Sequence, residues 1–235
     1  MKNLNKMDLY GKKSKSIPQK LIIVGLELIL LYFAYYIAFK SGGTLIYNHF
    51  GITMPEGNLY RRITIFCFSV IVFIRITFAM FVFVKRRIPF EETISIPFAF
   101  ALYYIGFAIF GYGSQTPVGI TDFIGIGIFI LGSYLNTVSE YQRHIWKKNS
   151  ENKGKLYTLK LFSHSMHINY FGDLLWVIGY SFVSLNIWSV WIPVLLFFFF
   201  VFFNIPKLDS YLAEKYQNQF NEYKKQTKKF IPFIY

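Results

Sequence analysis

Six long apolar runs dominate this sequence and limit what it can fold into. They lie at residues 21–39, 63–84, 95–113, 118–139, 170–187 and 188–204. A helix needs about 20 mainly apolar residues to cross a bilayer, and several of these runs approach that length. The last two runs are short and meet at Asn186, so they form either a tight hairpin or two tilted half-spans. The pattern predicts an all-α, polytopic membrane bundle with about six transmembrane helices, five or seven being the alternatives.

The composition agrees with a membrane protein. Of the 235 residues, 54% are hydrophobic and 21% are aromatic, more apolar surface than a soluble domain of this size could bury. The single cysteine, Cys67, lies inside an apolar run, which excludes a disulfide framework. The first apolar run is too long for the core of a signal peptide, so we expect it to be retained as an anchor.

The positive charge is distributed unevenly along the chain. Its formal net charge is +13, and the basic clusters lie before the first run, at 85–87, at 143–160 and after residue 207. With six spans, all these clusters fall on the same face as both termini, which the positive-inside rule makes cytoplasmic. We therefore expect an integral protein of a bacterial inner (cytoplasmic) membrane that contacts membrane lipids and binds no nucleic acid.

The chain divides into three parts on this interpretation. Residues 1–20 form a basic cytoplasmic tail, and residues 21–204 form the bundle with a cytoplasmic cofactor loop at 140–168. Residues 205–235 form an amphipathic cytoplasmic segment, with aromatic residues three or four apart, that ends at Pro232. Polar residues are concentrated in the last hundred positions, so we expect a soluble cofactor to bind there.

A polar stripe continues from the fourth apolar run. Its members are separated by four, three and four residues, which places them on one helical face: Asn136, Glu140, Arg143 and Lys147. An amide, a carboxylate and two cations on one face can hold a nucleotide, because the cations suit phosphates and the acceptors suit hydroxyl and amino groups. The alternative is a juxtamembrane helix on which Glu140 and Arg143 pair in solvent.

A second polar group stands where the fifth apolar run begins. Within seven residues the chain places four polar side chains: His167, Asn169, Tyr170 and Asp173. They are candidate ligands for a cofactor. The alternative is that Asn169 caps the fifth span, Tyr170 belongs to an interfacial aromatic belt and His167 is solvated. A metal site is not expected, because no thiol lies near His164 and His167.

Two charged residues lie deep inside the early spans. Glu27 and Arg75 differ in depth by only ~5 Å if both spans are regular helices, so they could pair with each other or face a substrate cavity. Asp122 stands near the outer end of its span, where a first-turn helix cap is expected. Possible proton donors of the early spans are Tyr35, Tyr36, Tyr103 and Tyr104.

One segment resembles a known family. The run "NKGKLYTLKLFSHSMHINYFGDLLWVIGY" at 152–180 is similar to the C-terminal signature of steroid 5-alpha-reductase-like integral membrane proteins, in which G-x-L and an aromatic residue precede R-H-P-N-Y-F-G-(D/E) and W-x-G. The ending "EYKKQTKKFIPFIY" also resembles the close of that family. The resemblance covers roughly residues 130–235. The usual Arg-His-Pro is replaced by Met166-His167-Ile168, which removes a cation and a proline.

The resemblance implies an all-helical bundle that binds NADPH from the cytoplasmic side. It implies that Asn136, Glu140 and Lys147 line the nucleotide pocket, and Arg143 shares their face. It also implies cofactor contacts from His167, Asn169, Tyr170, Asp173, Asp209 and Tyr211. The family's substrate-facing carboxylate has no aligned counterpart, and Glu27 is the candidate by its chemistry alone.

Three functions remain open. The first is an NADPH-dependent reductase of a C=C bond conjugated with a carbonyl in a lipid-like substrate (steroid, isoprenoid, acyl or quinone-like), with Glu27 or Tyr104 as the acid. The second is an S-adenosylmethionine-dependent methyltransferase of the isoprenylcysteine or phospholipid type. Those enzymes resemble the same region but tend to carry adjacent glutamates where this chain has Asp209 alone. The third is a non-catalytic membrane protein that keeps the fold. The oligomeric state is not predicted.

Overall fold

The structure is a computed structural model that describes residues 14–235, so most of the expected basic tail lies outside the described residues. The described chain is all-α, as predicted, and contains no β-strand between residues 14 and 235. Its elements are α2 (Ile17–Phe39), α3 (Gly42–His49), α4 (Leu59–Val82), α5 (Phe90–Ala101), η1 (Leu102–Gly106), α6 (Phe107–Tyr112), α7 (Ile120–Trp146), η2 (Ser150–Asn152), η3 (Lys160–Ser163), α8 (Ile168–Ser184), η4 (Ile187–Val190), α9 (Trp191–Phe199), η5 (Phe200–Asn204), α10 (Ile205–Tyr216) and α11 (Asn218–Gln226).

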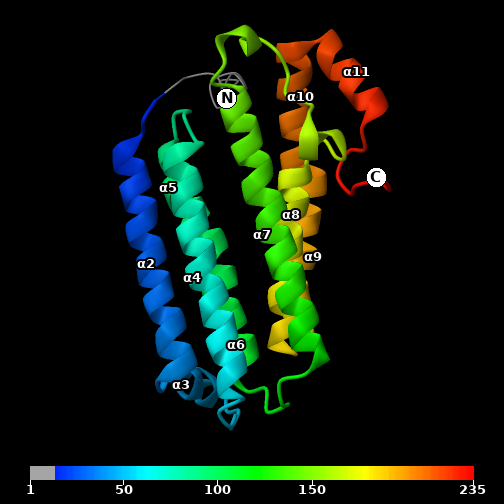
Figure 1. The fold of residues 1–235 in the computed structure, drawn as a ribbon. Helices are drawn as coiled ribbons and strands as arrows, with labels where there is room; N and C mark the ends of the chain where they lie inside the picture. Colours follow the sequence, from blue (N-terminus) through cyan, green and yellow to red (C-terminus); the bar gives the residue numbers. More distant parts are fainter. Residues whose placement is uncertain (1–13) are drawn as a thin grey trace.

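The bundle is built to lie in a membrane. Within residues 14–235, five helical segments are long and apolar enough to cross a bilayer: Ile17–Phe39, Leu59–Val82, Phe90–Tyr112, Ile120–Trp146 and Ile187–Tyr216. The remaining expected span, the fifth apolar run, is α8, which has only 17 residues and falls short of the usual ~20. It nevertheless runs beside α7 as part of the same bundle (Figure 1). The protein is an integral membrane protein.

The helices form two groups that share one interior. One group contains α2, α4 and the continuous segment from α5 to α6, and the other contains α7, α8 and the segment from α9 to α10 (Figure 1). The end of the bundle at which α7 ends and α10 and α11 lie carries the cationic segments 85–87, 143–160 and 207–229. We call it the basic end. The turns before α4, α7 and α9 lie at the opposite end (Figure 1).

Close approach of α7 and α8 depends on glycine. A Cβ atom on Gly132 would lie 2.3 Å from the backbone nitrogen of Trp176, and one on Gly172 would lie 2.5 Å from that of Asn136. Side chains at these positions would force the helices apart, so small residues are required, as is common between helices in lipid. The two helices that carry most of the predicted cofactor residues are therefore held in direct backbone contact.

Two local features differ from the sequence-based expectation. The third span contains a π-helical turn, η1, directly after the turn that holds Pro97. Such turns interrupt the regular hydrogen-bond ladder and are frequent at functional sites. The C-terminal amphipathic segment is not one helix running to Pro232, because Gln217 adopts a positive φ of 44° and divides it into α10 and α11, the second ending at Gln226.

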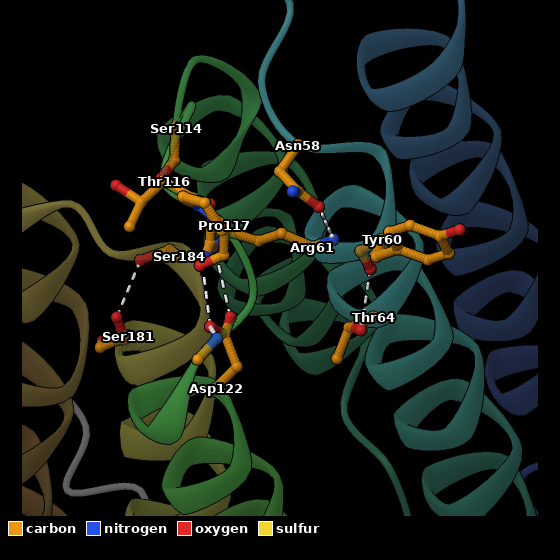
Figure 2. A network of polar contacts seen from close by, with 11 residues as sticks. Asn58, Tyr60, Arg61, Thr64, Ser114, Thr116, Pro117, Asp122, Ser181 and Ser184 are labelled. Carbon is orange, nitrogen blue, oxygen red and sulfur yellow. Dashed lines mark hydrogen bonds and ion pairs between the residues drawn. The ribbon is translucent and has the colours of Figure 1, made fainter.

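A buried polar network fastens the end of the bundle opposite the basic end. Asp122 accepts a hydrogen bond from the Gly119 backbone nitrogen (2.9 Å), which is the first-turn cap expected for it. The same carboxylate also forms an ion pair with Arg61 of α4, at 2.9 Å from Nη2 and 3.1 Å from Nε. Arg61 further donates to the Ser114 hydroxyl and the Thr116 carbonyl of the loop before α7 (Figure 2). This network joins the two helix groups.

Candidate cofactor and substrate site

The two predicted polar groups meet at the basic end of the bundle. The Asn136 amide of α7 donates to the Asn169 carbonyl of α8 (3.2 Å), and the Asn169 amide donates to Glu140 Oε1 (2.9 Å). Asn169 does not cap α8, because His167 occupies the N-cap position and the helix begins at Ile168. The helical stripe and the start of α8 thus form one polar surface.

Three cations lie beside this surface. Arg143 pairs with Glu140, and its guanidinium also lies 5.4 Å from the centre of the Phe162 ring. The pKa of Lys147 is lowered from 10.5 to about 8. The main cause is desolvation by the surrounding protein, and the positive charges of Arg143 and Lys215 lower it further. Lys147 itself remains exposed to solvent. Because Lys215 belongs to α10, the cluster combines cations from two helices, and its mutual repulsion favours an anionic ligand.

Lys215 was not predicted as a site residue, whereas Tyr211 was. The two residues are one helical turn apart on α10, and the Lys215 ammonium donates to the Tyr211 hydroxyl (2.8 Å). This bond places Tyr211 at the edge of the cation cluster. Only the tertiary fold, which brings α10 to the same end of the bundle as the last turn of α7, identifies Lys215 among the many lysines of the C-terminal segment.

His167 and Tyr170 connect α8 to the C-terminal segment. His167 is only 1% exposed, and its Nε2 lies 2.8 Å from Asp209 Oδ1, so it is not solvated. The other carboxylate oxygen of Asp209 faces the Lys229 ammonium at 3.4 Å. The Tyr170 ring stacks on His167 and on Phe200. His167 Nδ1 is buried and has no hydrogen-bonding partner in the described structure.

Arg75 lies inside the bundle and does not pair with Glu27. Its three nitrogens all donate to α7, to the side chains of Ser133, Asn136 and Thr137, each at 2.9 Å. The expected pairing rested on the similar depths of the two residues. Arg75 instead bonds to α7, because polar side chains of that helix lie within reach of its guanidinium group. Arg75 also interacts electrostatically with Asp173, whose carboxylate accepts a hydrogen bond from the Trp176 indole (2.8 Å).

Glu27 and Tyr104, the two predicted catalytic residues, are brought together. Glu27 of α2 is 1% exposed, Tyr104 of η1 is fully buried, and the two side chains interact with each other. Apart from each other, Glu27 Oε1 and the Tyr104 hydroxyl have no hydrogen-bonding partner in the described structure. Arg75 interacts electrostatically with Tyr104. Hydrogen-bonded polar groups therefore extend from Asn169 through Asn136 to Arg75, and the charge of Arg75 acts on Tyr104 inside the bundle.

The fold and this site define a class: a polytopic helical membrane protein with a polar, cation-rich site at one end and a buried acid–tyrosine pair within its bundle. Residues 93–227 match the family described as "Protein of unknown function (DUF1295)". The match spans more than half of the chain, so the chain belongs to this family.

Curated proteins of two kinds are similar to the chain. "Probable O-methyltransferase ustE" of Ustilaginoidea virens is 36% identical over 101 residues, 42% of this chain and 34% of that protein. "Protein-S-isoprenylcysteine O-methyltransferase" of Saccharomyces cerevisiae is 30% identical over 131 residues, 54% of each chain. "3-oxo-5-alpha-steroid 4-dehydrogenase 2" of Rattus norvegicus is 31% identical over 111 residues, 47% of this chain and 42% of that protein.

These relatives confirm the family resemblance expected from the sequence, because both groups of enzymes that it named are present. The chain spans about half, or less, of the length of the relatives it matches.

Proposed function

We propose that the protein is an NADPH-dependent reductase of a C=C bond in a lipid-like substrate, with its basic end in the cytoplasm of a bacterial cell. The observation that carries the proposal is the cluster of Arg143, Lys147 and Lys215 beside the polar surface of α7 and α8. Phosphate groups are bound well by such cations. S-adenosylmethionine carries a positively charged sulfonium instead, which this cluster would repel.

The residues at the basic end fit NADPH. The cations Arg143, Lys147 and Lys215 would hold its phosphates. The Glu140 carboxylate and the Asn169 carbonyl would accept hydrogen bonds from its hydroxyl or amide groups. His167 Nδ1 is a buried polar atom that lacks a partner, and a bound ligand would provide one. Burying such an atom without a partner is costly, so its presence at the start of α8 supports a ligand at this end of the bundle.

The buried pair would carry out the acid chemistry. When bound, NADPH supplies a hydride, which the β-carbon of an alkene conjugated with a carbonyl accepts. The Tyr104 hydroxyl would donate a hydrogen bond to the carbonyl oxygen and Glu27 would support it, so that the negative charge developing on the oxygen is stabilised. The resulting enolate would take up one proton at its α-carbon, and that proton would come ultimately from solvent. Both side chains are shielded from water, which strengthens these interactions. Substrate classes with this chemistry include sterols, polyprenoids, unsaturated acyl chains and quinone-like lipids.

A methyltransferase is the second candidate. The two relatives named as O-methyltransferases support it, and one of them aligns over 54% of both chains. Against it stands the cation cluster, and Asp209 already pairs with His167 and Lys229 rather than facing a ligand. A non-catalytic membrane protein is the third candidate, favoured by the loss of the arginine and proline at Met166 and Ile168.

Ligand-induced stabilisation of the detergent-purified protein separates these functions. A ligand at one hundred times its dissociation constant stabilises the folded state by about 2.7 kcal/mol, which a thermal-shift measurement detects. We expect a shift with NADPH, a smaller one with NADH and none with S-adenosylmethionine. A shift with S-adenosylmethionine alone overturns the proposal in favour of the methyltransferase, and no shift with any of them favours the non-catalytic protein.

Variants locate the cofactor site. Asn169→Ala and Asp173→Ala should abolish the NADPH shift while the unliganded protein stays folded, and Lys215→Gln should weaken it. Lys148→Gln is the matched control, because Lys148 is exposed and next to Lys147 in the chain but is not a member of the polar stripe. Glu27→Gln should lower turnover more than NADPH affinity. Unchanged binding in both Asn169→Ala and Asp173→Ala contradicts the site assignment.

A further inference from the structure

A surface cavity lies at the basic end, between the first turns of α10, the end of α11 and the segment 227–235 that follows it. Its volume is about 230 Å³, many times the ~10–15 Å³ that one water molecule requires, so a phosphate group fits inside. Three lysines and a hydroxyl group line it: Lys224, Lys228, Lys229 and Thr227. None of the three cations of the candidate cofactor site is among the described residues that line it, so the two sites are separate.

The charges that face the cavity favour an anion. Asp209 is the one acidic side chain among the described lining residues, and both of its oxygens are already engaged, by His167 (2.8 Å) and by Lys229 (3.4 Å). Lys224 and Lys228 are exposed and form no ion pair with a carboxylate within residues 14–235. These two uncompensated ammonium groups are therefore free to bind phosphate oxygens.

The cavity lies at the depth of the lipid headgroups. Asp209 stands five residues beyond Asn204, the last residue of the apolar run 188–204, which corresponds to ~7.5 Å along a helix. The headgroup layer on each side of a bilayer has a similar thickness, about 5–7.5 Å. Phe230 is fully buried in an apolar cluster that includes Phe200 of the last span. The segment that carries the lysines is therefore fastened to the membrane-spanning part of the bundle.

Beside the lysines the same segment exposes two large apolar side chains. Phe233 is 79% exposed and Ile234 is 74% exposed, and Ile234 also lines the cavity. The backbone nitrogens of Phe230 and Ile231 donate to the Tyr235 oxygen (2.6 Å each), which closes this part of the chain into a compact turn. Figure 1 shows the segment returning from α11 along the outside of the bundle. Apolar side chains next to lysines are the combination by which interfacial segments bind anionic membranes.

We infer that this cavity binds the phosphate group of an anionic phospholipid. The phosphate oxygens are held by Lys224, Lys228 and the Thr227 hydroxyl. The acyl chains of the lipid contact Phe233 and Ile234, which would otherwise remain exposed to water. The inference goes beyond the proposed function and does not depend on it, since neither NADPH nor a reducible substrate takes part.

Lipid retention by the detergent-purified full chain tests the inference. The protein is equilibrated with mixed micelles that contain equal amounts of phosphatidylglycerol and phosphatidylcholine with the same acyl chains, and native mass spectrometry counts the bound lipids. We expect the native protein to prefer phosphatidylglycerol. The double variant Lys224→Gln, Lys228→Gln should lower that preference at least about five-fold, because a single lysine at an anionic membrane surface is worth roughly that factor in affinity.

The double variant Lys153→Gln, Lys155→Gln is the matched control. These two lysines are exposed at the same basic end and carry the same total charge, but they do not line the cavity. Their replacement should leave the preference for phosphatidylglycerol unchanged. Equal losses in the two double variants would show a diffuse attraction between the basic end and anionic lipid, which overturns the inference.

Soluble competitors identify the source of the phosphate. Inorganic phosphate, glycerol phosphate and NADPH are added separately and in excess to the native protein with phosphatidylglycerol bound. We expect the lipid to be retained, because none of these competitors has acyl chains to contact Phe233 and Ile234. Displacement by inorganic phosphate or glycerol phosphate assigns the cavity to a small soluble anion, and displacement by NADPH assigns it to the cofactor. Either result overturns the inference.

Hydrogen–deuterium exchange provides a second measurement that needs no variant. The backbone nitrogens of Met166 and His167 donate to the carbonyls of Lys228 and Lys229, at 2.8 and 3.2 Å, so bound lipid should order both strands of this contact. Amides of residues 166–167 and 224–235 should exchange more slowly with phosphatidylglycerol than with phosphatidylcholine. Amides of the loop that carries Lys153 should not change. The same exchange rates in both lipids, or equal slowing in the loop, overturn the inference.

Discussion

Replacing Arg61 with methionine should lower the free energy of unfolding more than the loss of any other single ion pair that we describe. The Arg61 side chain is fully buried and forms two bonds to Asp122 at 2.9 and 3.1 Å. It also donates to the Ser114 hydroxyl at 3.1 Å and the Thr116 carbonyl at 2.6 Å (Figure 2). Arg61→Met leaves the Asp122 carboxylate buried without its counter-ion and the Thr116 carbonyl without its donor.

The expected loss follows from that geometry. Breaking a buried ion pair by removing one partner costs about 3–5 kcal/mol, because the remaining charge is uncompensated. The double variant Arg61→Met, Asp122→Leu removes both charges and should recover at least half of the loss. The remaining deficit would come from the loop carbonyl, at about 1–3 kcal/mol.

Equilibrium unfolding in mixed micelles, followed by helical circular dichroism, measures both free energies. Glu56→Gln is the control, because it removes a neighbouring ion pair whose carboxylate is 59% exposed and should change the unfolding free energy by about 0–1 kcal/mol. If Arg61→Met lies within about 1 kcal/mol of the native protein, or if the double variant is no more stable than the single one, the network does not join the helix groups as we argue.

Two further predictions concern the basic end. Because the pKa of Lys147 is about 8, this lysine loses its charge as the pH rises through 8, and NADPH affinity should fall. Lys147→Arg should abolish that fall when binding is measured from about pH 7 to 9.5. Between pH 8 and the ordinary lysine value of 10.5 the unfolded chain binds more protons than the folded one, so the Lys147 contribution to folding stability rises with pH, opposite in sign to its effect on binding. Gly132→Ala should lower the unfolding free energy by about 1–3 kcal/mol, because the added Cβ meets the backbone of α8. Gly127→Ala is the control and should be neutral or slightly stabilising, because nothing lies within 4 Å of its added Cβ. Equal effects of the two variants on unfolding would contradict the close packing of α7 and α8.

Much of this architecture is predictable from local sequence patterns. Hydropathy identifies the spans because lipid exposure selects apolar residues along whole helices, and the 3.6-residue period places Asn136, Glu140 and Arg143 on one face. The contact of this face with Asn169 also follows from the sequence in outline, because both stand at the same end of adjacent spans. The family resemblance led to the same residues.

The remaining features depend on long-range geometry. Lys215 joins the cation cluster only because the fold brings α10 to the end of the bundle where α7 ends, and nothing in the local sequence distinguishes it from neighbouring lysines. Arg75 and Glu27 have similar depths, but depth does not specify the direction of a side chain around its helix. The Arg75 guanidinium bonds to Ser133, Asn136 and Thr137, so Glu27 is left with Tyr104.

The distribution of satisfied and unsatisfied polar atoms separates structural from functional groups in this bundle. Arg61 and Arg75 have several well-formed hydrogen bonds, whereas the Tyr104 hydroxyl has only the Glu27 carboxylate beside it. If that hydroxyl serves a ligand, Tyr104→Phe should leave the melting temperature of the unliganded protein unchanged or raise it, because only a poorly paired buried hydroxyl is removed and the ring remains. The same variant should weaken enone binding and slow turnover. A melting temperature lowered by the ~1 kcal/mol typical of a lost hydrogen bond would show instead that the hydroxyl stabilises the fold, and the assignment of the buried pair to catalysis would have to be abandoned.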